Sequence, residues 1–544
     1  MLRFKRSFSF VGLVMAAVGL AASVTPSLLP RTPAVQGVLS GVAMAVGYGV
    51  GVAGVWAYRY FGWREPDDRR LAVIRVASAT VAVALGAASL TQMTAWQNSI
   101  RTLMNIDPIE SAYPMRTLAI AVAVACVVVT IVRGMIGTGR RVSRRLDRVM
   151  PRRVAVVIAG GLVAAGVSFV TNDVVVAAAL RAADGFFARW DATFDGDAGE
   201  PPSFAGDGSR IGWDSIGRQG KVFLTSGPTA SEIGEFNGTP AADPIRVYAG
   251  WRSADTMAGR AELALAELQR RGGFDRSVLI VATPTGTGWL DPSAVDTVEY
   301  LHGGDTAIVA TQYSYLPSWM TLYVDPQRSI DSARALFDVV YEHWKTLPEN
   351  DRPRLYLHGL SLGALGSERS ADLYTVFEDP IEGAVWSGPP FPSEVWRSLV
   401  RNRRPDTPPW SPKFRDGRLV RFLGGGGAVD RDRPWGPMRN VYVQYSSDPM
   451  VWFRPSLAWQ RPDWLTDPPG PDVSPQFRWY PLVTLLQVAM DIPLATSVPI
   501  GHGHNYAPAD YIDAWVAVTD PPHGTEERVS RLRSIFTRID PPAP

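Results

Sequence analysis

A serine between two glycines is the first residue of this chain that could do covalent chemistry. Residues 359–363 have the pattern Gly-x-Ser-x-Gly, with Ser361 between a strand-like run and a helix-like run. A sharp strand-to-helix turn projects the serine hydroxyl above a sheet, and small flanking residues avoid a clash. The chain holds 50 glycines, so an ordinary glycine turn is the alternative. The flanking runs favour the interpretation of Ser361 as a nucleophile.

A serine hydroxyl is a weak nucleophile unless a base lies beside it. The chain has six histidines, and two of them lie in the glycine-rich segment 501–506, which follows an apolar run. In such a loop an imidazole could swing over the serine. The pattern Gly-x-Gly-His-x-aromatic favours His504 as the base, with His502 as the alternative. His358 lies on the strand itself, and we expect it to pack or to make a supporting hydrogen bond.

The third member of such a site is a carboxylate that fixes the tautomer of the imidazole. Asp448 ends the strand-like run 440–447, which places serine, aspartate and histidine in the chain order that this kind of elbow requires. The alternative for Asp448 is the start of an Asp-Pro turn with Pro449. We therefore predict a catalytic triad of Ser361, Asp448 and His504.

Backbone amides are expected to stabilise the oxyanion that forms when a serine attacks a carbonyl group. The segment 283–289 follows an early strand and is rich in glycine and threonine. Amides at Thr285 and Gly286 could act together with that of Leu362. A phosphate-binding interpretation of this segment fails, because no Gly-Lys-Ser/Thr sequence follows it. The only cysteine is Cys126, and no cysteine and histidine cluster could hold zinc, so neither a metal nor a cofactor is expected.

The C-terminal part of the chain must position these residues. From residue 221 onward strand-like runs alternate with helix-like runs such as 253–271 and 330–344, a pattern that predicts a mostly parallel sheet with helices on both faces. A segment rich in proline, tryptophan and arginine at 402–439 fits neither element and is expected to form a cap. The expected strands are 221–224, 245–248, 277–282, 306–312, 354–357, 382–386, 441–445 and 496–500.

The N-terminal third has the composition of a membrane domain. It contains long uncharged runs, each near the roughly 20 apolar residues that cross a bilayer. We predict a helical membrane domain at 1–182, a linker at 183–220 and a catalytic domain at 221–544. Buried core helices are the alternative, and a signal peptide is a second one for the first run. The expected spans are 7–30, 32–58, 76–100, 117–132 and 154–180, the last interrupted by Asn172 and Asp173.

Positive charge predicts the orientation of these spans. Arginines cluster at 59–70 and at 140–153, and Arg3, Lys5 and Arg6 precede the first span. Because positively charged loops stay in the cytoplasm, five spans would place the catalytic domain on the extracytoplasmic face. If the fifth run does not cross the membrane, the catalytic domain would instead be cytoplasmic. The whole chain has a net charge of +2 with 19% charged residues, which excludes the strongly basic surface of a nucleic-acid-binding protein.

The chain resembles the α/β-hydrolase family whose members carry an N-terminal multi-span domain and a C-terminal catalytic domain. The resemblance covers nearly the whole chain and implies an α/β-hydrolase fold with an esterase or lipase-like activity, without identifying a substrate. Leu360 departs from the family pattern, in which a glutamate would precede the serine. The segments that carry the resemblance are 283–289, 312–319, the elbow at Ser361, 386–391 and 501–504.

These observations favour hydrolysis of an ester through an acyl-serine intermediate. A lipid or another acylated envelope component is the expected substrate, since the site would be tethered at a bilayer and the chain contains 18 tryptophans. Acyl transfer to a sugar or lipid hydroxyl would use the same triad. A non-catalytic membrane scaffold or transporter is the third alternative. The intact triad order and the lack of paired charges in the expected spans argue against it. Protein partners and oligomeric state are left open.

Overall fold

The computed structural model describes residues 8–63, 67–168, 202–205, 208–371, 379–424, 429, 433–466, 468–522 and 524–537. The chain divides into two compact units. The N-terminal unit comprises Met1–Ala182, Phe453–Pro469 and Val473–Leu494, and the catalytic unit comprises Ala183–Trp452, Gly470–Asp472 and Ala495–Pro544. The first segment of the N-terminal unit ends at Ala182, and two later segments join this unit.

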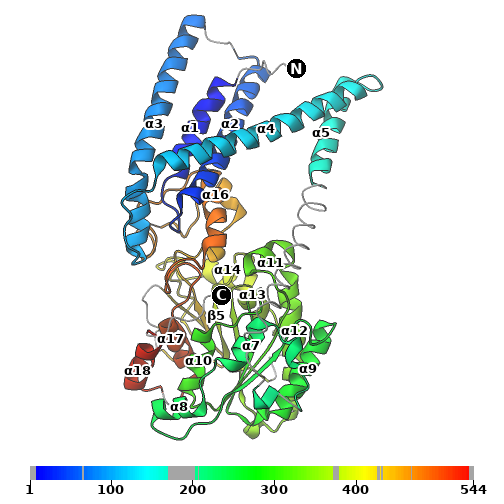
Figure 1. The fold of residues 1–544 in the computed structure, drawn as a ribbon, viewed down its shortest axis with the longest axis vertical. Coiled ribbons are helices and arrows are strands. Elements are labelled where there is room, and N and C mark those ends of the chain that lie inside the picture. Colours follow the sequence, from blue (N-terminus) through cyan, green and yellow to red (C-terminus); the bar gives the residue numbers. More distant parts are fainter. Residues whose placement is uncertain are drawn as a thin grey trace. The chain divides into compact units, whose positions relative to one another are not determined.

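The N-terminal unit is helical (Figure 1). In the described part of the chain, α2, α3 and α4 are long and apolar enough to cross a membrane. Helix α1 has 14 residues, or about 21 Å at the usual rise, which is shorter than a bilayer core. It ends before Pro26 and Pro30, although the uncharged run continues to residue 30. The helices are α1 (Phe10–Ser23), α2 (Pro33–Tyr60), α3 (Asp68–Leu103), α4 (Pro114–Leu146), α5 (Arg152–Ser168) and α16 (Val483–Asp491).

Glycines on α2 allow close packing against two neighbouring helices. A Cβ atom added to Gly47 would lie 2.3 Å from the Met15 carbonyl oxygen on α1. A Cβ atom on Gly41 would lie 2.7 Å from the Ala121 carbonyl oxygen on α4. Small residues at helix interfaces let backbones approach in this way, as in many membrane helix pairs. The second half of the predicted fifth span, including Asn172, lies outside the described residues, as does most of the predicted linker.

The catalytic unit is built on a seven-stranded sheet in the order β1-β3-β2-β4-β5-β7-β6. Every strand pair is parallel, and the apolar strands are buried along most of their length, as expected for a sheet covered on both faces. The strands are β1 (Ile245–Ala249), β2 (Val278–Thr283), β3 (Thr306–Thr311), β4 (Arg354–Leu360), β5 (Gly383–Ser387), β6 (Val420–Leu423) and β7 (Arg439–Val443).

Helices cover the two faces of this sheet in two groups (Figure 1). One group contains α9, α12 and α13, and the other contains α8, α10, α17 and α18. The helices of the unit are α7 (Arg218–Thr225), α8 (Ala230–Asn237), α9 (Met257–Arg270), α10 (Pro292–Leu301), α11 (Ser318–Val324), α12 (Gln327–Thr346), α13 (Leu362–Ser367), α14 (Glu394–Arg401), α15 (Pro449–Trp452), α17 (Pro508–Thr519) and α18 (Glu526–Phe536).

Three local predictions differ from the structure. The expected strand at 221–224 is part of helix α7, where Lys221 and Leu224 are buried at helical spacing. The expected strand at 496–500 is a loop, since Pro499 cannot donate a ladder hydrogen bond. The expected cap at 402–439 contains β6, which pairs with β7 and forms the edge of the sheet. The predicted fold class, a helical membrane domain followed by an α/β-hydrolase fold, is confirmed.

Candidate active site

Ser361 lies at the turn between β4 and α13, with φ 60° and ψ −127°. This backbone conformation is strained for a residue with a side chain, and such strain is typical of functional sites. The flanking glycines are required by close packing. A Cβ atom on Gly359 would lie 2.4 Å from the Gly363 carbonyl oxygen, and one on Gly363 would lie 2.2 Å from the Thr283 carbonyl oxygen. The structure therefore gives a steric reason for both glycines of the pattern.

The strand register brings the ends of three strands to one level. Leu360 at the end of β4 pairs with Ser387 at the end of β5, and Ser387 pairs with Val443 at the end of β7. Ser361 follows the first of these strands, and Asp448 follows the third by five residues. Carboxyl ends of parallel strands are where ligands bind in open α/β sheets. The predicted nucleophile and acid thus lie along the same edge.

His504 and Asp448 form a buried hydrogen-bonded pair. Nδ1 of His504 lies 2.6 Å from Oδ2 of Asp448. The Tyr506 hydroxyl donates to the same Oδ2 at 2.6 Å, and the Met450 amide donates to Oδ1 at 2.8 Å. A carboxylate held in this way fixes the proton of the imidazole on Nδ1 and leaves Nε2 as an acceptor. Asp448 immediately precedes α15, which begins at Pro449. Asp448 therefore both starts the Asp-Pro turn and pairs with His504.

A chain of contacts places this imidazole beside the serine turn. The Ser361 amide donates to the Ser387 carbonyl oxygen at 2.9 Å. The next residue, Gly388, has φ +53°, and a Cβ atom on it would lie 2.4 Å from Cε1 of His504. Ser361 Oγ and His504 Nε2 are both buried, and neither has a hydrogen-bond partner within the described part of the chain. Serine and base often lie beyond hydrogen-bonding distance without substrate and approach when it binds.

The predicted oxyanion-hole residues lie around the same turn. Thr283 at the end of β2 and Pro284 in the loop that follows it lie directly against Gly363. In this loop the Thr285 amide donates to the Trp289 carbonyl oxygen at 2.9 Å, and the Gly286 amide donates to Ser318 Oγ at 2.9 Å. Both amides would have to exchange these partners to bind a substrate oxygen. The third predicted donor is the amide of Leu362, which follows the serine in the chain.

The remaining predicted histidines have other surroundings. His358 is buried, and its Nδ1 lies 2.8 Å from the Val385 carbonyl oxygen, so its expected packing role is confirmed. Burial lowers the pKa of His358 to about 4, which keeps the ring neutral. Nδ1 of His502, the alternative base, lies 3.9 Å from Oδ2 of Asp472. His502 therefore faces a different carboxylate from His504.

Sequence reasoning missed several residues around the site. Tyr506 was noted only as an aromatic position, and Gly388 only as part of a family segment. Glu368 is buried and immediately follows α13, where it accepts hydrogen bonds from the Ser393 hydroxyl and from the Tyr442 hydroxyl, the latter at 2.9 Å. Burial raises the pKa of Glu368 to about 7. A carboxylate whose hydrogen-bond donors come from two distant segments leaves no local signal in a sequence.

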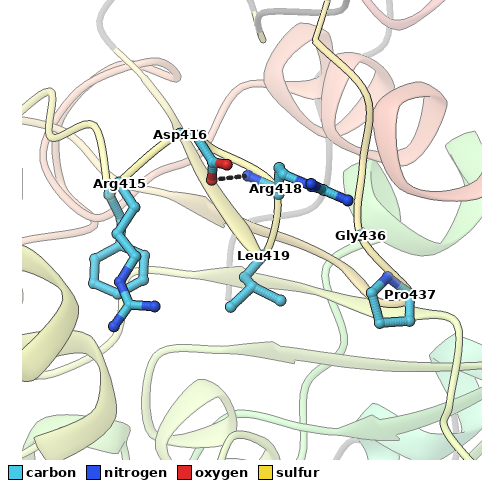
Figure 2. A pocket seen from close by; sticks show the side chains of 7 residues that line it. Arg415, Asp416, Arg418, Leu419, Gly436 and Pro437 are labelled. Carbon is cyan, nitrogen blue, oxygen red and sulfur yellow. Dashed lines mark hydrogen bonds between the residues drawn. The ribbon is translucent and has the colours of Figure 1, made fainter.

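A pocket of about 500 Å³ lies elsewhere, in the segment that was expected to form a cap (Figure 2). Its seven lining residues run from Phe414 to Pro437 and include none of the predicted triad. The Arg418 amide donates to Asp416 at 3.3 Å at its rim. Among the described residues, no group of three histidine, cysteine or acidic side chains is arranged to hold a metal.

Comparisons with known proteins agree with this architecture. The sequence model of the α/β-hydrolase family matches residues 245–532, and that of the α/β-hydrolase family N-terminus matches residues 24–228. No curated protein matches the chain, and no solved structure matches it. The first match covers all seven strands, the serine turn and the Asp448–His504 pair. With more than half of its length matched and a parallel sheet of the expected kind, the chain belongs to the α/β-hydrolase family.

Proposed function

We propose that this chain is a membrane-anchored serine hydrolase that cleaves carboxylic esters through an acyl-serine intermediate. The observation that carries the proposal is the buried His504–Asp448 hydrogen bond of 2.6 Å, whose imidazole lies beside the strained turn of Ser361. Family membership supports hydrolase chemistry in general. The specific assignment to a serine nucleophile rests on this geometry.

In the proposed reaction, Ser361 Oγ attacks the ester carbonyl carbon while His504 Nε2 accepts the hydroxyl proton. Asp448 stabilises the imidazolium that forms. The imidazolium then protonates the leaving alcohol, and the carbon–oxygen bond of the ester breaks to give an acyl-serine. A water molecule then loses a proton to His504 and attacks the acyl carbon. The bond between that carbon and Ser361 Oγ breaks to release the carboxylic acid, and His504 returns the proton to Ser361 Oγ. The amide of Leu362 is the proposed donor to the oxyanion in both steps.

An acylated lipid or envelope component is the proposed substrate class. The N-terminal unit has three helices, among those described, that are long and apolar enough to cross a membrane, so the catalytic unit would work close to a bilayer. Helix α11 supports the same conclusion. It begins at Ser318, which binds the Gly286 amide, and it ends with Tyr323 and Val324, whose exposed fractions are 55% and 40%. Exposed apolar side chains on a helix that contacts the Gly286 loop suit an acyl chain.

We further propose that the catalytic unit lies on the extracytoplasmic face. The arginine clusters at 59–70 and 140–153 lie on the α2–α3 and α4–α5 connections and on the helix ends beside them. Placing both in the cytoplasm follows the positive-inside rule. The fifth span predicted from the sequence, 154–180, would then lead outward.

The direct test is labelling with a fluorophosphonate probe, which reacts with activated serines. Membranes that contain the full chain should be labelled, and the Ser361→Ala variant should show neither labelling nor hydrolysis of p-nitrophenyl esters. The matched control is Ser534→Ala on α18, whose exposed hydroxyl lies outside the proposed site. It should behave like wild type. Full labelling of Ser361→Ala would show that another residue is the nucleophile.

A further inference from the structure

A second buried carboxylate connects the loops that hold Asp448 and His504. Asp472 is 5% exposed and accepts short hydrogen bonds from the hydroxyls of Ser446 and Ser447. These two serines immediately precede Asp448 in the chain. Asp472 therefore binds the loop that carries the proposed triad acid, Asp448, although Asp472 itself is not part of that loop.

The same contacts continue to the loop of the base. Ser447 Oγ accepts a hydrogen bond from the Gly503 amide at 2.8 Å, and Gly503 immediately precedes His504. Oδ2 of Asp472 also lies 3.9 Å from Nδ1 of His502. The Asp472 carboxylate thus binds the two residues that precede Asp448. Through Ser447 it is also connected to Gly503, the residue that precedes His504.

The segment that carries Asp472 is packed tightly against these loops. A Cβ atom on Gly470 would lie 2.2 Å from the side chain of Ser446, so glycine is needed at this approach. Burial tends to raise the pKa of Asp472, but the two serine hydroxyls and the neighbouring His502 lower it, and the net pKa is below its ordinary value. Asp472 is accordingly charged at neutral pH, which strengthens the hydrogen bonds that it accepts.

We propose that Asp472 is a positioning residue, which keeps the Asp448 and His504 loops in the relative arrangement that the triad requires. The inference rests on the proposed function, because it assigns a role relative to that triad. Asp472 does not touch the reacting atoms. It acts through Ser447 and Gly503, and misplacement of a catalytic group by about 1 Å can lower a rate on the order of 100-fold.

The origin of Asp472 in the chain makes this role unusual. Gly470–Asp472 is a three-residue stretch of the catalytic unit, and the segments on either side of it, Phe453–Pro469 and Val473–Leu494, belong to the N-terminal unit. The connection between the proposed acid and the proposed base therefore passes through the N-terminal unit twice. Only Asp472 and the two residues before it return to the catalytic unit in between.

The test compares full-length variants in detergent by ester hydrolysis and by the rate of fluorophosphonate labelling. Asp472→Ala should lower kcat by on the order of 100-fold with little change in KM, and slow labelling should still reach completion because Ser361 remains. Ser447→Ala is the milder variant and should lower kcat in the same direction. The double variant Ser447→Ala/Asp472→Ala should be no slower than Asp472→Ala, since both act on one path.

A variant without the base separates positioning from folding. In the His504→Ala background, Asp472→Ala should cause no further loss of residual activity, because there is no imidazole left to position. Loss of the same factor in both backgrounds, or wild-type kcat for Asp472→Ala, would overturn the inference. Failure of the proposed function is a different result: the wild-type chain would then show neither labelling nor hydrolysis that depends on Ser361.

Discussion

A buried ion pair in the N-terminal unit offers the sharpest stability prediction. Arg31 precedes α2, and Asp491 is the last residue of α16, in one of the later segments that belong to this unit. Their closest nitrogen–oxygen distance is 2.7 Å, and both side chains are fully buried. Asp491 also accepts from the Ser27 hydroxyl at 2.7 Å, and Arg31 donates to the Gln487 carbonyl oxygen at 2.9 Å. The pair joins the late segment to the first helices.

We predict that Asp491→Ala destabilises this unit strongly. Removing one partner leaves the Arg31 guanidinium buried without its counter-charge, which typically costs about 3–5 kcal/mol. In a unit of roughly 200 residues, a loss of 1 kcal/mol lowers the melting temperature by about 2–4 °C, so the expected shift is on the order of 10 °C. The double variant Arg31→Met/Asp491→Leu replaces the pair with apolar side chains and should recover most of that shift.

The assay is the thermal transition of the full chain in detergent, followed by tryptophan fluorescence. Glu342→Ala serves as the control. Its pair with Lys345 has a similar distance of 2.8 Å, but the Glu342 side chain is 64% exposed, and such pairs contribute about 0–1 kcal/mol. Equal melting temperatures for Asp491→Ala and Glu342→Ala would refute the reasoning. So would a double variant that is less stable than Asp491→Ala.

Four further predictions concern the site and its surroundings. His504→Ala should lower the turnover of a p-nitrophenyl ester by several orders of magnitude, about as triad deletions do elsewhere, and wild-type turnover would exclude this base. Asp448→Asn should lower it by about 10⁴, because an amide stabilises the wrong tautomer of the imidazole. The pKa of Glu368 is about 7 against an ordinary 4.5, so the folded state retains a proton that the unfolded state releases, and stability should fall as the pH rises between these values. Melting temperatures of Glu368→Gln should lack this part of the pH dependence; an unchanged profile would contradict it. A reporter that is active only outside the cytoplasm should be active after Pro544 and silent at Thr138, and the reverse result would invert the proposed orientation.

Much of the catalytic unit could be predicted because the relevant signals are local. A strand-like run, a Gly-x-Ser-x-Gly turn and a helix-like run are adjacent in the chain, and the structure supplies the close contacts that make Gly359 and Gly363 necessary. The same holds for strands such as β2 and β3, whose apolar runs of six residues are buried throughout. Where the local apolar pattern matches the burial of the folded chain, as in these strands, the periodicity of the sequence predicts the secondary structure.

Local pattern fails where tertiary contacts decide the structure. Residues 221–224 are apolar enough for a strand, yet they form part of α7 because their neighbours complete a buried helical face. The segment 402–439 has little periodicity, and its edge strand β6 is short and pairs on only one side. The absence of charges at 7–30 likewise predicted one long apolar span. It could not show that the helix in this run, α1, ends at Ser23.

The division of the chain into units could not be predicted, for a topological reason. Predicting spans from hydropathy finds segments that are long and apolar, whereas Val473–Leu494 contains a helix of only nine residues. This segment belongs to the N-terminal unit through an aspartate that binds an arginine 460 residues earlier. A single buried charge pair at that separation has no periodicity and changes the composition of neither segment. The segment lies between Asp448 and His504 in the chain, so the connection between the proposed acid and the proposed base leaves the catalytic unit.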